Sequence, residues 1–128
     1  MQRSFRLSRS EDFKRVRRNG KSYAHPLVVL VAQENNTGGH LKIGIAAGKT
    51  TGSAVHRNRA KRLLREAMRT LIPSITLQHA LVDGQDSAPG WDLILIARPA
   101  LVSATLSDAR SALENVLRRA GIIPYNES

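Results

Sequence analysis

Between Ala54 and Arg69 the chain reads Ala-Val-His-Arg-Asn-Arg-Ala-Lys-Arg-Leu-Leu-Arg-Glu-Ala-Met-Arg. Wound into a helix, this run has an apolar side and a cationic side, because residues three and four apart share a face. The apolar side contains Ala60, Leu63, Leu64, Ala67, Met68 and Leu71. The opposite side, called the basic face below, contains Asn58, Lys61, Arg62, Arg65 and Arg69, with Arg57 and Arg59 at its flanks. The pattern predicts a helix from about residue 53 to residue 71 that docks on a core.

The charge of the basic face points to a partner outside the chain. A solvated helix face normally mixes both signs, since oppositely charged side chains four residues apart stabilise each other. Between Ala54 and Arg69, however, Glu66 is the only acid against six cations. Repulsion among these cations favours the binding of an external anion.

Composition narrows the class of that anion. The chain has 128 residues, which predicts a single domain, and a formal charge of +10. Residues 1–72 hold 16 of the 20 Lys and Arg residues against 4 acids, so the positive excess belongs to the first half. This asymmetry favours nucleic acid over an anionic membrane or an acidic small molecule.

The sequence also indicates a cytoplasmic protein. It contains no Cys, which fits a reducing compartment and excludes disulfides and Cys-based zinc sites. No apolar run approaches the ~20 residues of a membrane-spanning helix, and the first six residues lack the apolar stretch of a signal peptide.

Periodicity and turn residues predict the element order αββαβα. A helix is expected over 9–19, with Ser8 and Glu11 as a capping box and Gly20 as its end. Strands are expected over 23–33 and 41–47, paired as a hairpin across a turn at 35–39. The basic helix should stop before Pro73, and the last strand and helix should cover 91–97 and about 106–120. The loose segment 75–90 is long for a compact domain, so part of it is helical or mobile.

Enzyme signatures are mostly missing. The four His residues are scattered without metal-ligand spacing, and Glu11 with Asp12 fits complementing a helix dipole better than catalysis. The loop 48–52 does not match the phosphate-binding pattern of nucleotide hydrolases. Its glycines leave two alternatives: either backbone donors and Lys49 hold one phosphate, or the loop is a plain tight turn.

Two aromatic residues have alternative roles. Phe13 lies among cations, where it either stacks on a nucleotide base or packs in the core. Trp91 follows a Gly at the head of a strand, where an anchor of the sheet edge is favoured over a base-stacking platform.

Several short motifs carry a specific resemblance. The basic helix contains Arg57-Asn58-Arg59-x-Lys61-Arg62-x-x-Arg65-Glu66. Other motifs extend over nearly the whole chain: Glu11-Asp12-Phe13, Gly20, Lys42-Ile43-Gly44, Gly52-x-Ala54-Val55 and Ala97-Arg98-Pro99. Together they resemble the bacterial ribonuclease P protein family.

The resemblance implies a fold of the α+β class, with one RNA-binding domain over residues 1–128. It implies an α/β sandwich with a central sheet of about four strands and a left-handed crossover through the basic helix, although general topology rules predict the opposite hand. It also implies that the protein cleaves nothing alone. A large catalytic RNA, using Mg²⁺ bound mainly by RNA, would hydrolyse precursor tRNA to remove its 5′ leader, and the protein would assist that RNA.

The resemblance further implies two sets of binding residues. Phe13, Arg17 and Val31 would bind the single-stranded leader in a cleft between the first helix and the sheet. Relatives often carry aromatics where this chain has Arg17 and Val31, so leader binding is expected to rest more on charge than on stacking. The catalytic RNA would contact Lys49, Arg57, Asn58, Arg59, Lys61, Arg62, Arg65 and Arg69.

Two alternatives from other classes remain. A ribosomal or general RNA-binding module would have similar charge and fold. A stand-alone metal-dependent nuclease is poorly supported, because the acids are few and are not clustered as a two-metal site requires.

Overall fold

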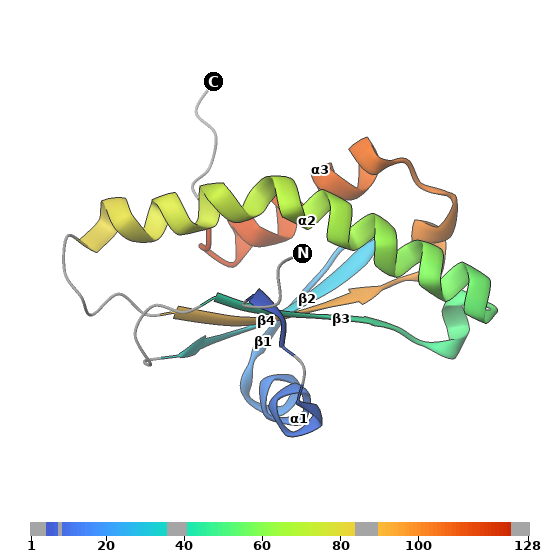
Figure 1. Ribbon diagram of the computed structural model, residues 1–128, viewed down its shortest axis with the longest axis horizontal. Helices are drawn as coiled ribbons and strands as arrows, with labels where there is room; N and C mark the ends of the chain where they lie inside the picture. Colours follow the sequence, from blue (N-terminus) through green and yellow to red (C-terminus); the bar gives the residue numbers. More distant parts are fainter. Residues whose placement is uncertain (1–4, 8, 36–40, 84–89, 124–128) are drawn as a thin grey trace.

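A four-stranded sheet forms the middle layer of the protein, with α2 and α3 on one face and α1 on the other (Figure 1). The arrangement comes from a computed structural model that describes residues 5–7, 9–35, 41–83 and 90–123, and only the backbone of 76–83. The elements, in chain order, are α1 (Ser10–Asn19), β1 (Lys21–Ala24), β2 (Val28–Asn35), β3 (Leu41–Ala47), the 3₁₀ turn η2 (Lys49–Thr51), α2 (Ala54–Asp83), β4 (Gly90–Ala97), the 3₁₀ turn η3 (Pro99–Ser103) and α3 (Leu106–Arg119). The α+β class and the central sheet are therefore confirmed.

The two strands that were predicted to pair as a hairpin, over 23–33 and 41–47, are not neighbours in the sheet. The order is β1-β2-β4-β3, so β4 lies between the two strands that were expected to pair. β4 runs antiparallel to β2 and parallel to β3, and α2 makes the crossover between β3 and β4. The continuous apolar run Leu93-Ile94-Leu95 is fully buried on both faces, which requires a central position in the sheet. The hand of the crossover stays a prediction.

The strand predicted over 23–33 is in fact two strands. It divides at Pro26, whose missing N–H excludes it from a central ladder. His25 and Val28 exchange backbone hydrogen bonds across the resulting turn, with N···O distances of 2.9 and 3.3 Å. The hairpin of the fold is therefore β1–β2, and the element order is αβββαβα.

Two helix boundaries also differ from prediction. Arg9 is the N-cap of α1 and makes no side-chain capping bond, whereas the predicted cap, Ser8, lies outside the described residues. α2 continues through Pro73 to Asp83, so the predicted stop is wrong and the start of the loose segment is helical. A Pro inside a helix costs about 3 kcal/mol. Burial of Ile72 and Ile75 on either side of it offsets that cost, because each such side chain contributes roughly 1.5–3 kcal/mol.

Gly20 ends α1 as predicted, because the chain turns there against the sheet. A Cβ at this position would lie 2.7 Å from the Val16 carbonyl oxygen and 2.9 Å from that of Ala32. Only glycine fits such a close backbone approach.

The sheet buries an apolar cluster on each face. The main core lies between the sheet and the pair α2 and α3, and it includes Leu30, Ile43, Leu64, Leu95 and Leu113. The small core lies under α1 and consists of Leu7, Val16, Val31 and Ile94, with Phe13, Val29 and Ile96 partly buried around it. No helix in the described part of the chain is long and apolar enough to cross a membrane.

Candidate nucleic-acid interface

The basic face lies on the outer side of α2. Ala60, Leu64, Ala67, Met68 and Leu71 are buried in the main core and Leu63 is half-buried, which confirms the predicted docking side. On the opposite side the charged residues reach solvent: Asn58, Arg59, Arg62, Arg65 and Arg69 are exposed, and Arg57 and Lys61 are half-buried.

Few acids neutralise the basic face. Glu66 pairs with Arg69 at 3.2 Å, and both side chains are more than half exposed. Within the described residues, no ion pair reaches Arg57, Lys61, Arg62 or Arg65. Because these cations keep their charge uncompensated, the face attracts a polyanion.

Arg59 is held in place by a neighbouring turn. Its Nε donates to the Val102 carbonyl oxygen in η3 at 2.9 Å. The bond fixes the plane of the guanidinium and leaves its two Nη groups for another acceptor. A shallow hollow of about 380 Å³ lies beside it, lined by Val55, Asn58, Arg59 and Arg62. Val55 is 76% exposed there, so the basic face also carries one apolar contact point.

The loop before α2 is a tight turn. The Thr51 and Gly52 amides donate to the Gly48 and Lys49 carbonyls at 3.0 and 3.1 Å, so they are not free to hold a phosphate. Gly52 has a φ of 126°, a conformation that favours glycine. The Lys49 side chain is exposed beside the start of the basic face. The tight turn therefore accounts for the Thr51 and Gly52 amides, and a phosphate contact by Lys49 stays a prediction.

The predicted leader residues separate into two groups. Phe13 is half-buried and its ring lies on Gly44 of β3, where an added Cβ would be 2.9 Å from ring atom Cε1. Arg17, one turn later on the same flank of α1, is exposed. Val31 is only 3% exposed, because it packs in the small core under α1. Its side chain therefore has no surface to offer a ligand, and its role is packing.

Sequence reasoning missed Val29 and Ile96, which do keep some surface. They lie opposite each other in β2 and β4, on the face that α1 covers, and both are partly buried. The signal was present: Val29 is two residues before Val31, so it shares the same sheet face. With Phe13 they form an apolar strip that is only partly buried.

Sequence reasoning also missed the Arg15–Asp92 pair, which fixes α1 to the sheet. Asp92 in β4 is 5% exposed and accepts a 2.8 Å hydrogen bond from Arg15 Nη2 and another from Asn35 Nδ2. Arg15 also donates to Gln33 Oε1 at 2.7 Å and to Asp12 Oδ1 at 3.2 Å. The hydrogen bond to Asp92 raises the pKa of Arg15 above its usual value. Arg15 is thus occupied inside the protein, whereas Arg17 on the other flank is exposed.

The described residues do not assemble a metal site of their own. No group of three His, Asp or Glu side chains lies close enough together in that part of the chain to hold a cation. The arrangement offers positive charge, hydrogen-bond donors and an apolar strip.

Comparison with known proteins identifies the family to which this chain belongs. The sequence model of the family described as Ribonuclease P matches residues 1–121. The chain belongs to the ribonuclease P protein family. It is 36% identical over 124 residues to the ribonuclease P protein component of Roseiflexus castenholzii, covering 96% of this chain and 91% of that one. It is 37% identical over 120 residues to that of Herpetosiphon aurantiacus, covering 94% and 87%.

A solved ribonuclease P protein has the same fold. The Staphylococcus aureus RNase P protein superposes with a TM-score of 0.75 at 28% identity, covering 95% of this chain and all of that one. The resemblance inferred from the Arg57–Glu66 motif is therefore confirmed. Because the likeness covers 95% of this chain, the sheet and helices that position the basic face share the fold of that protein.

Proposed function

We propose that this chain is the protein subunit of a ribonuclease P ribonucleoprotein, acting in the cytoplasm on precursor tRNA. The RNA subunit would perform the cleavage that removes the 5′ leader. The observation that carries the proposal is the basic face, where Arg57, Lys61, Arg62 and Arg65 have no acidic partner among the described residues, in a chain of this family.

The basic face would bind the RNA subunit. The RNA subunit and its substrate are both polyanions, so bringing them together is electrostatically unfavourable, and a compact positive surface offsets the repulsion. Arg suits this task because its planar guanidinium binds phosphate through two hydrogen bonds. Arg59, oriented by Val102, would present its Nη groups in a fixed plane. Asn58 is neutral, so it would orient a neighbouring Arg, a water or a 2′-hydroxyl.

The flank of α1 would bind the leader. Phe13, Val29 and Ile96 supply an apolar strip, and Arg17 supplies charge for the backbone of a single strand. Val31 leaves the set because it is buried. The small apolar area supports a leader contact that depends more on charge than on stacking.

Mg²⁺ would be bound by RNA. The described residues gather no set of carboxylates and imidazoles that fits the ion, so no step of the reaction is assigned to this chain. The protein's own residues neutralise and position phosphates.

Reconstitution tests the proposal. Precursor tRNA is incubated with the protein, with the RNA subunit, and with both, at low and high Mg²⁺. We expect no cleavage by the protein alone and a strong stimulation of the RNA at low Mg²⁺. Accurate cleavage at the mature 5′ end without any RNA subunit would refute the division of labour, and copurification with ribosomes instead would support the general RNA-binding alternative.

A double substitution tests the assigned surface. Replacing Arg62 and Arg65 with Ala should weaken binding to the RNA subunit and lower the slope of log affinity against log salt by about one to two, since each removes about one phosphate contact. Both residues point away from the main core, so the circular dichroism melt should not change. An unaltered salt slope would mean that the basic face is not the interface.

A further inference from the structure

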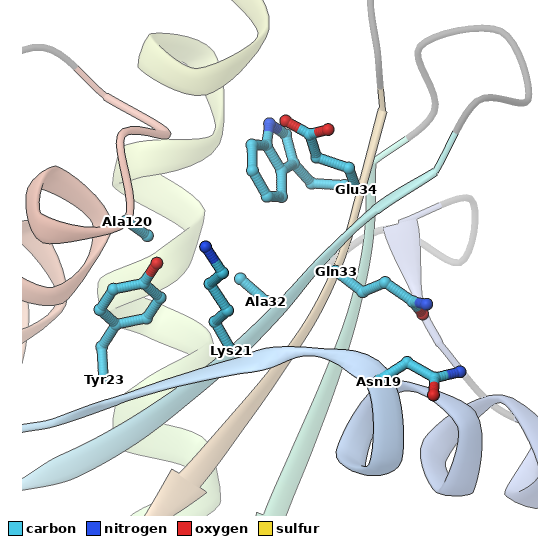
Figure 2. A pocket seen from close by; sticks show the side chains of 8 residues that line it. Asn19, Lys21, Tyr23, Ala32, Gln33, Glu34 and Ala120 are labelled. Atoms are coloured by element: carbon cyan, nitrogen blue, oxygen red, sulfur yellow. The ribbon is translucent and has the colours of Figure 1, made fainter.

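A second hollow lies at the edge of the sheet, where β1 begins and β2 ends (Figure 2). Its volume is about 360 Å³, at the small end of the range for ligand pockets, which is roughly 300–1,000 Å³. It is lined by Asn19 at the end of α1, by Lys21, Tyr23, Ala32, Gln33 and Glu34 of β1 and β2, and by Trp91 and Ala120. Figure 2 shows Lys21 and Tyr23 pointing from β1 toward the end of α3.

The hollow exists because a small residue lies between large ones. In the sheet Ala32 is paired with Lys21, and two residues further on Glu34 is paired with Trp91. Since alternate residues share a face, the short Ala32 side chain forms a floor between Lys21, Glu34 and Trp91. Tyr23 and Trp91 pack partly against the main core, whereas Phe13 and Val29 lie on the other face. The part of the hollow formed by Lys21, Tyr23, Glu34 and Trp91 therefore lies on the sheet face opposite Phe13 and Val29, and Asn19 and Gln33 line its other side.

The hollow holds one positive and one negative side chain that do not neutralise each other. Lys21 and Glu34 are both exposed, and neither side chain forms an ion pair with any residue that the structure describes. Other acids of the chain do have partners. Asp12 on α1 pairs with Arg15, and Glu66 on α2 pairs with Arg69. An unpaired carboxylate repels phosphate but accepts hydrogen bonds from the amino and imino groups of a base.

We propose that this hollow binds one unstacked guanine nucleotide. The base would lie against Tyr23 and Trp91, because aromatic faces stack on nucleobases. Glu34 would accept from N1–H and the N2 amino group, since guanine presents two adjacent donors that match the two oxygens of a carboxylate. Lys21 would bind the phosphate. The proposal rests on the proposed function only in taking RNA as the natural source of the nucleotide.

Trp91 makes the test direct, because it is the only Trp in the chain. The full chain is titrated with GMP, IMP and UMP at millimolar concentrations while Trp fluorescence is recorded. We expect saturable quenching by GMP, binding about tenfold weaker for IMP, which lacks the N2 amino group, and no saturation with UMP. No saturable response to GMP, or equal responses to all three, would overturn the proposal.

Paired variants assign the response to the two charges. Glu34→Gln should weaken GMP about tenfold and abolish the difference between GMP and IMP. Lys21→Ala should weaken binding and lower its salt dependence. The matched controls, Glu66→Gln on α2 and Arg110→Ala on α3, should leave the titration unchanged. If Glu34→Gln behaves as the parent while its circular dichroism spectrum is intact, the hollow does not bind guanine as proposed.

A final experiment distinguishes a free guanine nucleotide from a guanine within an RNA strand as the ligand. A short single-stranded oligoribonucleotide with one G among U residues is compared with GMP. Tighter binding of the oligoribonucleotide supports a strand as the ligand, and equal binding supports the free nucleotide; both outcomes support the guanine site. None of these measurements uses the RNA subunit. Failure here therefore leaves the proposed function standing, and failure of reconstitution leaves this site standing.

Discussion

Phe13 and Gly44 act as one unit, although 30 residues separate them in the chain. The absence of a side chain at position 44 lets the Phe13 ring lie on β3, and the ring in turn brings α1 close to the sheet. The contact joins two of the motifs of the resemblance, Lys42-Ile43-Gly44 and Glu11-Asp12-Phe13, in the folded chain. Phe13 thus packs against Gly44 while it stays half-buried, and its stacking on a base remains a prediction.

The first prediction concerns the space above Gly44. Gly44→Ala should destabilise the fold by about 1–3 kcal/mol, because the new Cβ displaces the Phe13 ring from its packed position. Gly48→Ala is the control, since a Cβ there meets nothing within 4 Å. Thermal melts of both variants decide the point. Equal melting temperatures would mean that the ring moves without cost.

The second prediction concerns the free surface of Phe13. Phe13→Ala should reduce the affinity for precursor tRNA by about 1–3 kcal/mol beyond its effect on mature tRNA, since only the precursor carries a leader base to stack. Phe13→Leu retains most of the packing and removes the aromatic face, so it should lose the same selectivity with a smaller change in melting temperature. A destabilised Phe13→Ala with no selective loss would leave Phe13 as a core residue only.

At the scale of elements, α1 is attached to the sheet by apolar packing and by the polar side chain of Arg15. Val16 packs in the small core, and Arg15 reaches Asp92, 77 residues away in the sequence. The attachment decides which flank of α1 is available. Asp12 and Arg15 lie on the bonded flank, so Phe13 and Arg17 are left on the open one.

The third prediction tests that attachment. Asp92→Ala should cost about 1–3 kcal/mol of stability, because it removes a buried acceptor of two hydrogen bonds. Glu66→Ala removes a carboxylate from an exposed pair with Arg69 and should cost about 0.5 kcal/mol or less. Urea unfolding of both variants compares them. If both cost the same, Asp92 does not hold α1 in place.

Sequence reasoning predicted the faces of α2 correctly but predicted the pairing of the strands wrongly. The division of α2 into a buried apolar side and the basic face was predicted correctly, because helical periodicity is local and strong between Ala54 and Leu71. The β2–β3 hairpin was wrong because the strand that separates the two, β4, comes 43 residues after β3 ends, beyond any local signal. Pro26 was a usable signal that was missed. Pro73 misled in the opposite direction, because burial of Ile72 and Ile75 outweighs its effect on the helix.

The site residues divide in the same way. The cations of α2 followed from spacing, whereas the burial of Val31 could not be read without the position of α1 above β2. The Arg15–Asp92 contact depends on tertiary pairing of distant segments, and neither residue has a distinctive neighbourhood in the sequence.

At the scale of the whole molecule, the uneven charge of the sequence becomes a surface on α2 that is distinct from α3. α2 carries the basic face, in which Arg62 and Arg65 lack acidic partners among the described residues. On α3, Arg110 and Arg118 both pair with Glu114 at 3.3 Å. The position of the charge, rather than the total of +10, should therefore determine how the protein assists an RNA partner.

The fourth prediction separates position from total charge. Arg62→Ala and Arg110→Ala each lower the net charge by the same amount, but only Arg62 belongs to the basic face. Cleavage of precursor tRNA by the reconstituted ribonucleoprotein is followed across a Mg²⁺ titration with saturating protein. Because protein cations and Mg²⁺ both neutralise phosphate, loss of a phosphate contact must be compensated by more Mg²⁺. Arg62→Ala should thus raise the Mg²⁺ midpoint, while Arg110→Ala, whose charge is already paired with Glu114, should leave it unchanged. Equal shifts for the two variants would show that net charge alone sets the Mg²⁺ requirement.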